Sequence, residues 1–167
     1  MKDKVTLVTG ATRGIGAAIA RTLAEAGAKV IGTATTQDGA DRISAALAPL
    51  GGRGIVLNVT DAAAIDAALK DIEAKEGAVA ILVNNAGITQ PVKTLDITGT
   101  DYDRILDVSL RGTLYMSQAV LPAMKQQQSG SIVCISSVSA QRGGGIFGGP
   151  HYSAAKAGVL GLARAMA

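Results

Sequence analysis

Two side chains near the end of the sequence have types and spacing suited to proton transfer. Tyr152 and Lys156 stand four residues apart, so on a helix the phenol and the ammonium share one face. A nearby cation favours the phenolate form of a tyrosine, which lets the phenol exchange a proton near neutral pH. On spacing alone such a pair is more often a surface contact, so the acid-base interpretation needs support from elsewhere in the sequence.

A glycine-rich turn near the N-terminus has the pattern of a phosphate-binding site. It lies directly between an apolar run and a segment of helical period. Gly10 permits a tight turn, and Gly14 and Gly16 let backbone amides approach a pyrophosphate that the helix dipole favours. The alternative is a plain turn without a ligand. The predicted contacts of this turn with a dinucleotide are Gly10, Thr12, Arg13, Gly14, Ile15 and Gly16.

The residues after the second predicted strand indicate which dinucleotide fits. An acid at this place holds the ribose 2'-hydroxyl of NAD, whereas the 2'-phosphate of NADP requires positive charge. Residues 32–36 read Gly-Thr-Ala-Thr-Thr and contain no acid, while Arg13 can pair with a phosphate and Thr35 offers a hydroxyl donor. NADP(H) is therefore predicted in preference to NAD(H). A solvated loop role is the alternative for Arg13.

These residues need a scaffold, and the pattern between them predicts one. Short β-branched runs alternate with alanine-rich segments of helical period, which is typical of a parallel sheet with helices on both faces. The sequence predicts an α/β fold, a Rossmann-type doubly wound parallel sheet in three layers (α/β/α) with strand order 3-2-1-4-5. The expected strands are residues 5–8, 29–33, 54–59, 79–83 and 131–136. The expected helices are residues 15–26, 41–50, 61–76, 101–127, where Pro122 is expected to kink or end the helix, and one from about residue 152.

Composition limits the classes of function. The 167 residues carry a net charge of +3 with scattered basic residues and no Trp, which argues against a nucleic-acid surface. Cys134 is the single cysteine and stands in an apolar run, so it is expected to pack in the core rather than form a disulfide. No apolar run approaches the roughly 20 residues of a membrane helix, and no signal-peptide pattern is present. A cytoplasmic single domain over residues 1–167, without a metal site, is expected.

Four motifs that occur in a fixed order give the sequence a family resemblance. They are TGATRGIG at 9–16, NNAG at 84–87, ISS at 135–137 and YSAAK at 152–156. In this order they resemble the short-chain dehydrogenase/reductase family over nearly the whole chain. The first 60 residues, including KVIGTATT and LNVTD, are similar to bacterial 3-oxoacyl-acyl-carrier-protein reductases in particular.

The resemblance implies roles for individual residues. Tyr152 would be the general acid in reduction and the base in oxidation, and Ser137 would hydrogen-bond the substrate carbonyl. Lys156 would bind the nicotinamide ribose and favour the phenolate, so Tyr152 and Lys156 would also contact the cofactor. Five further cofactor positions are implied, two at the adenine and three beside the ribose: Asn58, Val59, Asn85, Ala86 and Gly87.

Two positions depart from the family pattern. The family usually has an asparagine in the long helix that completes a proton relay through water to the lysine, and Ser109 takes that place here. A hydroxyl can still hold a water, so weakened rather than lost activity is expected. The loop before Tyr152 is longer than in the carrier-protein reductases, and counting back selects Ser139 as the substrate contact. The ISS context favours Ser137, and His151 is expected to be a loop side chain.

The function that follows is NADP-linked hydride transfer between nicotinamide and a carbonyl or secondary alcohol. A 3-oxoacyl thioester is the leading substrate, with an acyl carrier protein as partner. The long helix ends with Lys125 and three glutamines, a weak rim for an acidic carrier, so a sugar, polyol or small ketone is the alternative. An alternative of another class is a catalytically weak nucleotide-binding sensor or scaffold, suggested by Ser109.

The resemblance has two consequences for assembly. The family continues for about another third of its length with further strands, so the sheet is expected to lack C-terminal strands and to leave an edge uncovered. Apolar surface on the long helix and on the Tyr152 helix favours a homo-oligomer, either a dimer or a tetramer.

Overall fold

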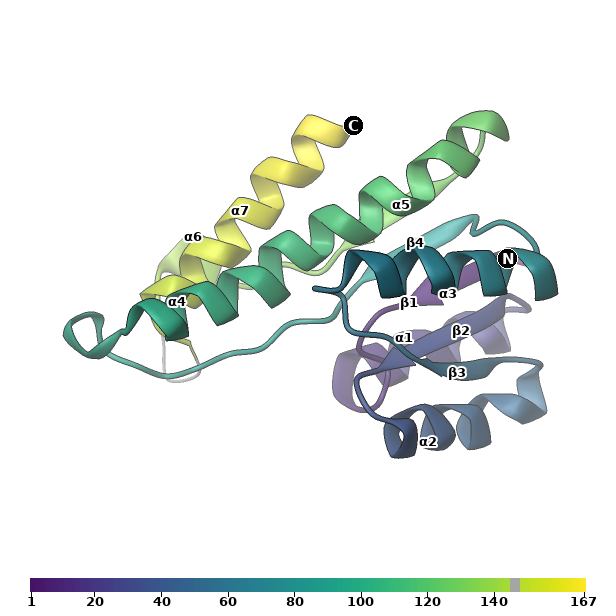
Figure 1. The fold of residues 1–167 in the computed structure, drawn as a ribbon, viewed down its shortest axis with the longest axis horizontal. Coiled ribbons are helices and arrows are strands. Elements are labelled where there is room, and N and C mark those ends of the chain that lie inside the picture. The colour runs from purple at the N-terminus through teal and green to yellow at the C-terminus, as the bar shows by residue number, and fades with distance from the viewer. Residues whose placement is uncertain (145–147) are drawn as a thin grey trace.

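The computed structural model of the protein describes residues 1–144 and 148–167, and its centre is one parallel sheet (Figure 1). The strands are β1 (Val5–Val8), β2 (Lys29–Ala34), β3 (Arg53–Val56), β4 (Ile81–Asn84) and β5 (Ser131–Cys134). Their order is β3-β2-β1-β4-β5, and every neighbouring pair is parallel. The predicted Rossmann-type sheet and its strand order are confirmed. Because the order reverses between β1 and β4, the ends of these strands flank the point where such sheets bind ligands.

Helices cover both faces of this sheet. They are α1 (Gly14–Glu25), α2 (Gln37–Leu47), α3 (Ala62–Lys75), α4 (Gly99–Leu106), α5 (Gly112–Gln126), α6 (Ser139–Arg142) and α7 (Pro150–Met166). One buried cluster joins α1 and α2 to the sheet and includes Val8 of β1. The other joins α3 and α5 to the opposite face and includes Leu7. Successive side chains of a strand point to opposite faces, so β1 serves both clusters and the three layers follow.

Several elements have bounds that differ from the sequence prediction. α2 begins at Gln37 rather than residue 41, because the Thr36 hydroxyl caps it by accepting a hydrogen bond from the Gly39 amide over 3.2 Å. A 3-10 turn, Ala48–Leu50, follows it. β3 ends at Val56 rather than residue 59, so the predicted adenine contacts lie in the loop after the strand. α7 begins at Pro150, two residues before the predicted start near residue 152.

The long helix predicted over residues 101–127 is interrupted in the structure. α4 and α5 are separated by a π-helical stretch, Asp107–Arg111, and Pro122 lies inside α5 without ending it. π-helical turns are rare, and they often occur at functional sites. Figure 1 shows α4 and the start of α7 together at one end of the molecule, away from α2. The interrupted helix therefore lies beside the helix that carries Tyr152 and Lys156.

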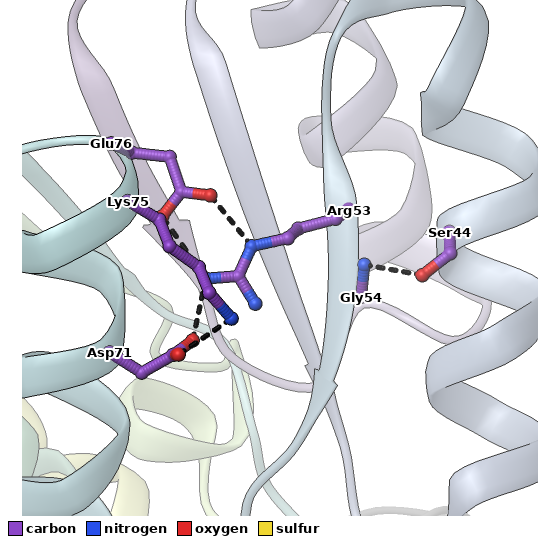
Figure 2. A network of polar contacts seen from close by, with 6 residues as sticks. All are labelled: Ser44, Arg53, Gly54, Asp71, Lys75 and Glu76. Atoms are coloured by element: carbon purple, nitrogen blue, oxygen red, sulfur yellow. Dashed lines mark hydrogen bonds and ion pairs between the residues drawn. The ribbon is translucent and has the colours of Figure 1, made fainter.

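β3 is an edge strand, and side chains of the flanking helices fasten it (Figure 2). Arg53 donates to Glu76 over 2.7 Å and to Asp71 over 2.8 Å, which attaches the strand to α3 and its C-cap. On the other side, the Ser44 hydroxyl of α2 accepts a hydrogen bond from the Gly54 amide over 2.9 Å. The Ser44 contact occupies a backbone amide that an open sheet edge would otherwise offer to another chain.

β5 forms the opposite edge, and part of it is open. The side chain of Val133 is 44% exposed in the described structure. The observed edge agrees with the expectation of an uncovered sheet border beside β5.

Of the helices that the structure describes, none combines the length and the apolar character required to cross a membrane.

Candidate functional site

The glycine-rich turn after β1 has the backbone that its sequence predicts. Gly10 and Gly14 have φ angles of 67° and 57°, in the left-handed region that glycine adopts without strain. Gly16 is buried where α1 passes closest to the turn. A Cβ at Gly16 would lie 2.3 Å from the Gly10 carbonyl oxygen and 2.4 Å from Nδ2 of Asn85. Only glycine fits there, so the N-terminus of α1 lies against the turn.

The start of α1 is available to an anion. Its N-cap, Arg13, is exposed and makes no side-chain capping bond within the described structure. The first N–H groups of a helix have no partner inside the helix and carry the positive end of its dipole. Uncapped amides beside a glycine turn are a suitable site for a pyrophosphate.

Two threonines and an asparagine hold the glycine turn in place. The Thr9 hydroxyl accepts hydrogen bonds from the amides of Asn85 and Ala86 over 3.0 and 2.9 Å. The Asn85 side chain donates to the carbonyls of Thr9 and Gly10, and the Thr33 hydroxyl accepts from the Gly10 amide. Asn85, predicted beside the ribose, thus has its amide nitrogen on the backbone of the turn. Thr9 and Thr33 were missed in the sequence, where the only signal was their polarity within buried strand ends.

A cleft of about 300 Å³ opens at the point where the strand order reverses. Most of the predicted cofactor contacts meet in its lining, whereas Gly14, Ile15 and Gly16 follow the lining residues at the start of α1. The lining residues are Gly10, Thr12, Arg13, Thr33, Ala34, Thr35, Leu57, Asn58, Val59, Ala86, Gly87, Ile88 and Val108. Sequence reasoning missed the apolar members Leu57, Ile88 and Val108, although each is adjacent to a residue that was predicted. The cleft combines apolar walls with the uncapped turn, which suits a dinucleotide.

Arg13 is the charged residue in the described lining of this cleft. It lies at the N-cap of α1, and Thr35 lines the cleft after the end of β2, where an acid would select NAD. Among the described residues of the lining there is no Asp or Glu. A 2'-phosphate would therefore meet a guanidinium and a hydroxyl and no carboxylate.

Lys156 belongs to α7, and its side chain is buried against the end of β5. Its Nζ donates a hydrogen bond to the Ile135 carbonyl over 2.8 Å, and burial lowers the pKa of the ammonium. A Cβ at Gly87 would lie 3.3 Å from this nitrogen and 3.6 Å from the Ser109 hydroxyl oxygen. Gly87 also lines the dinucleotide cleft, so the two sites predicted from separate motifs meet at this glycine.

Tyr152 lies half-buried in the first turn of α7, one helical turn before Lys156. A Cβ at Gly148 would lie 2.4 Å from Cδ1 of its ring, so the ring rests on this glycine. His151 is not a loop side chain as expected. It is a helical residue, 2% exposed, and neither ring nitrogen has a hydrogen-bond partner among the described residues. The helix begins at Pro150, so His151 belongs to its first turn.

Ser109 is fully buried in the π-helical stretch between α4 and α5. Its hydroxyl oxygen is 3.4 Å from both the amide nitrogen and the carbonyl oxygen of Ile88. The Ser109 carbonyl accepts a hydrogen bond from the Thr113 hydroxyl over 3.3 Å. The structure thus brings Ser109 to the segment that lines the cleft and, through Gly87, to Lys156.

The two candidate substrate serines lie together after β5. The Ser137 hydroxyl accepts a hydrogen bond from the Ser139 amide over 3.2 Å, and both residues are half-buried. Neighbouring Ser136 donates to the Lys156 carbonyl over 2.7 Å. This bond ties the serine turn to α7, so Ser137 and Ser139 both belong to the region around Lys156. The rest of the glycine-rich loop includes residues 145–147, which lie outside the described residues.

Cys134 is only half-buried, whereas core packing was expected. Its sulfur accepts a weak hydrogen bond from the Asn84 side chain over 3.8 Å, and burial raises the pKa of the thiol. Within the described residues, no group of three or more His, Cys, Asp or Glu side chains could hold a metal ion.

Comparisons with known proteins agree with this arrangement. The family model for short chain dehydrogenases matches residues 4–167. An uncharacterized short-chain type dehydrogenase/reductase of Sinorhizobium fredii is 51% identical over 172 residues, which cover 100% of this chain and 68% of the relative. The 3-oxoacyl-acyl-carrier-protein reductase of Escherichia coli is 46% identical over 166 residues, which cover 99% of this chain and 67% of the relative.

Solved structures have the same fold. The crystal structure of gox2181 superposes with a TM-score of 0.95 at 33% identity, covering 100% of this chain and 66% of that one. A short-chain dehydrogenase from Streptomyces avermitilis gives 0.89 at 39% identity, covering 98% and 60%. The chain spans about two thirds of the length of these relatives. With its strand order, its glycine turn and its tyrosine and lysine, the chain belongs to the short-chain dehydrogenase family of oxidoreductases.

Proposed function

We propose that the protein is an NADP(H)-dependent enzyme that transfers hydride between the nicotinamide and a carbonyl or secondary alcohol. One observation carries the proposal: Gly87, which lines the dinucleotide cleft, packs against Nζ of Lys156 and the hydroxyl of Ser109. The acid-base helix and the cleft therefore share a border. Uncapped amides at α1 and the acid-free lining in the described residues fit the phosphates of the cofactor.

Each residue of the site has a proposed task. The cofactor, when bound, supplies or accepts the hydride. In reduction, Oη of Tyr152 donates its proton to the substrate oxygen, and the Ser137 hydroxyl donates a hydrogen bond to the same oxygen as charge develops. Lys156 holds the ribose and favours the phenolate by its charge. Ser109 holds a water that returns a proton toward Lys156.

The proposed preference for NADP(H) over NAD(H) rests on Arg13 and Thr35 in the described lining of the cleft. A guanidinium pairs with a phosphate in a bidentate, charge-assisted contact. Arg13→Ala should therefore weaken NADPH binding and leave NADH binding nearly unchanged, as measured by fluorescence titration of both cofactors. Equal affinities for NADPH and NADH in the unaltered protein would contradict the 2'-phosphate assignment.

The proposed substrate is a 3-oxoacyl thioester, in a cytoplasmic reaction with an acyl carrier protein as partner. Support comes from the 46% identity to the E. coli 3-oxoacyl-acyl-carrier-protein reductase. The exposed residues at the end of α5 are one lysine followed by three glutamines, a weakly basic rim for an acidic carrier. For that reason a sugar, polyol or small ketone is the second candidate substrate.

We further propose a homo-oligomer, dimer or tetramer, of this single domain. A groove of about 600 Å³ runs between the π-helical stretch and α7. Its lining is rich in leucine and small residues: Leu106, Asp107, Leu110, Arg111, Leu114, Gly158, Gly161, Leu162 and Ala165. Leu110→Glu should shift sedimentation toward the monomer, because association would bury the new carboxylate against the second copy. A concentration-independent monomer for the unaltered protein would contradict the proposal.

Oxidation of NADPH with a panel of ketones tests the function directly. The panel contains a 3-oxoacyl thioester, a ketose and a simple cyclic ketone. Tyr152→Phe keeps the ring but removes the transferable proton, so turnover should fall by about 10²- to 10⁴-fold while NADPH binding persists. Tight NADPH binding with no turnover of any ketone would instead favour a sensor or scaffold. Equal turnover by the Phe variant would remove Tyr152 from the mechanism.

A further inference from the structure

We propose that Gln90 is a positioning residue for Tyr152, acting through the two glycines that precede α7. The proposal rests on the oxidoreductase function proposed above. Gln90 lies on the connection from β4 to α4, which crosses Figure 1 as a long extended trace. Nothing in the sequence motifs points to it, because it stands three residues after the NNAG segment and carries no reactive group.

The contacts of Gln90 join three parts of the structure. Its backbone carbonyl accepts a hydrogen bond from the Gly149 amide over 2.9 Å. Its side-chain nitrogen donates to Oδ1 of Asp101 over 2.8 Å, and its side-chain oxygen accepts from Arg104 over 3.2 Å. Since Asp101 and Arg104 belong to α4, one glutamine connects the start of α7 to α4.

The first turn of α7 has few other polar anchors. Gly149 is the N-cap and supplies no side-chain capping bond, and Pro150 has no N–H. The ring nitrogens of His151 have no partner among the described residues. Among the described residues, the bond from the Gly149 amide to the Gln90 carbonyl is therefore a backbone contact that holds the chain as it enters the helix.

Tyr152 rests on this anchored entry. A Cβ at Gly148 would lie 2.4 Å from the tyrosine ring and 3.2 Å from the Thr89 hydroxyl oxygen. A Cβ at Gly149 would lie 2.6 Å from the carbonyl oxygen of Val92. Gly148 thus lies between the ring and Thr89, and Gly149 lies against Val92 of the same segment, which Gln90 fixes. A shift of residues 89–92 moves the surface that supports the tyrosine.

Loss of this support should affect proton transfer more than cofactor binding. A misplacement of about 1 Å between reacting groups can cost on the order of 10²-fold in rate. Gln90 does not belong to the described lining of the dinucleotide cleft. Gln90→Ala should therefore lower kcat about tenfold or more and leave the Kd of NADPH unchanged.

A charge-matched pair of variants provides the decisive test. Gln90→Glu sets a carboxylate oxygen against the Asp101 carboxylate, and like charges at this distance repel. Asp101→Asn in the same chain restores a donor toward that carboxylate, while the remaining amide oxygen continues to accept from Thr98. We expect Gln90→Glu to lower kcat and the double variant to recover most of it. Gln118→Ala, at an exposed glutamine of α5, is the control for losing a glutamine and should leave kcat unchanged.

A readout independent of turnover completes the test. Hydrogen exchange of the Gly149 amide and the NMR signal of a labelled Tyr152 ring report directly whether the chain is held where it enters α7. Faster exchange and a shifted ring signal in Gln90→Glu, both reversed in the double variant, support the proposal. Unchanged exchange and kcat in Gln90→Ala and Gln90→Glu would overturn it, even where Tyr152→Phe abolishes turnover. Turnover in Tyr152→Phe equal to that of the unaltered protein would overturn the proposed function alone, because the exchange data test the role of Gln90 separately.

Discussion

The side-chain nitrogen of Lys156 donates a hydrogen bond to the Ile135 carbonyl over 2.8 Å, which joins α7 to the end of β5. The residue is 4% exposed, and burial lowers the pKa of its ammonium below the ordinary value of 10.5. A charged group in this place loses hydration that a single carbonyl only partly replaces. The site thus holds a base whose proton is easier to remove than that of a surface lysine.

Lys156→Met should change how stability depends on pH. Because the folded-state pKa is below the unfolded-state value, the charged lysine destabilises the fold at neutral pH. That penalty disappears as the pH rises from the lowered pKa toward 10.5, when both states become neutral. The stability of the unaltered protein relative to the Met variant should therefore increase from pH 7 to pH 10. Urea unfolding at each pH measures it, and a constant difference would contradict the lowered pKa.

Gly16→Ala should be far more damaging than Gly14→Ala. A methyl group at Gly16 would meet the Gly10 carbonyl oxygen at 2.3 Å, so α1 must move away from the turn. At Gly14 no atom lies within 4 Å, and only the left-handed backbone is unfavourable, at about 1–2 kcal/mol. Thermal unfolding and NADPH titration of both variants compare them. Near-normal NADPH affinity in Gly16→Ala would show that α1 need not touch the turn.

Ser109→Asn should raise turnover without changing the affinity for NADPH. An amide has both a donor and an acceptor, so it can keep the two contacts with Ile88 and reach a water toward Lys156. Ser109→Ala is the matched variant that removes the hydroxyl, and its turnover should fall. Steady-state kinetics with the ketone panel measure both. Unchanged turnover in the Asn variant would mean that water reaches Lys156 by another route.

Arg53→Ala should destabilise the protein by about 1 kcal/mol, with less effect at high salt. The guanidinium lies between Asp71 and Glu76 and is 27% exposed on the edge strand (Figure 2). Arg42→Ala is the control, because its pair with Asp38 is exposed within one helix and should contribute less than about 0.5 kcal/mol. Urea unfolding at low and high salt separates them. Equal effects would show that the network adds nothing to a single surface pair.

Much of the fold and part of the site follow from the sequence alone. The alternation of buried runs with helical segments predicted the sheet and its strand order, which the structure confirms. Gly10 was predicted to permit a tight turn and Gly14 to let backbone amides approach a pyrophosphate, and both have the positive φ angles that glycine permits. A helix was predicted to begin at residue 61, and Asp61 caps α3 because its carboxylate accepts a hydrogen bond from the Ala64 amide over 3.0 Å. The glycine turn and the helix cap depend on residues that are neighbours in the chain.

Other features were decided by the tertiary structure. Ser109 was predicted inside one long helix, and the structure places it in a π-helical stretch between two helices. One additional residue in a turn barely changes the apolar period, so no sequence pattern reveals it. His151 was expected in a loop and lies buried in α7. Its burial depends on the path of the chain before Pro150, which distant segments hold.

The contacts that join the two motifs were also beyond the sequence. The Thr9 hydroxyl accepts a hydrogen bond from the Asn85 amide across 76 positions of the chain, and the backbone carbonyl of Gln90 accepts one from the Gly149 amide. Periodicity, glycine turns and caps express the conformational preferences of adjacent residues, so a single sequence determines them. Which hydroxyl or amide satisfies a buried backbone group depends on segments that meet only after the layers pack. Chain order therefore determined the elements, and packing decided which side chains complete the site.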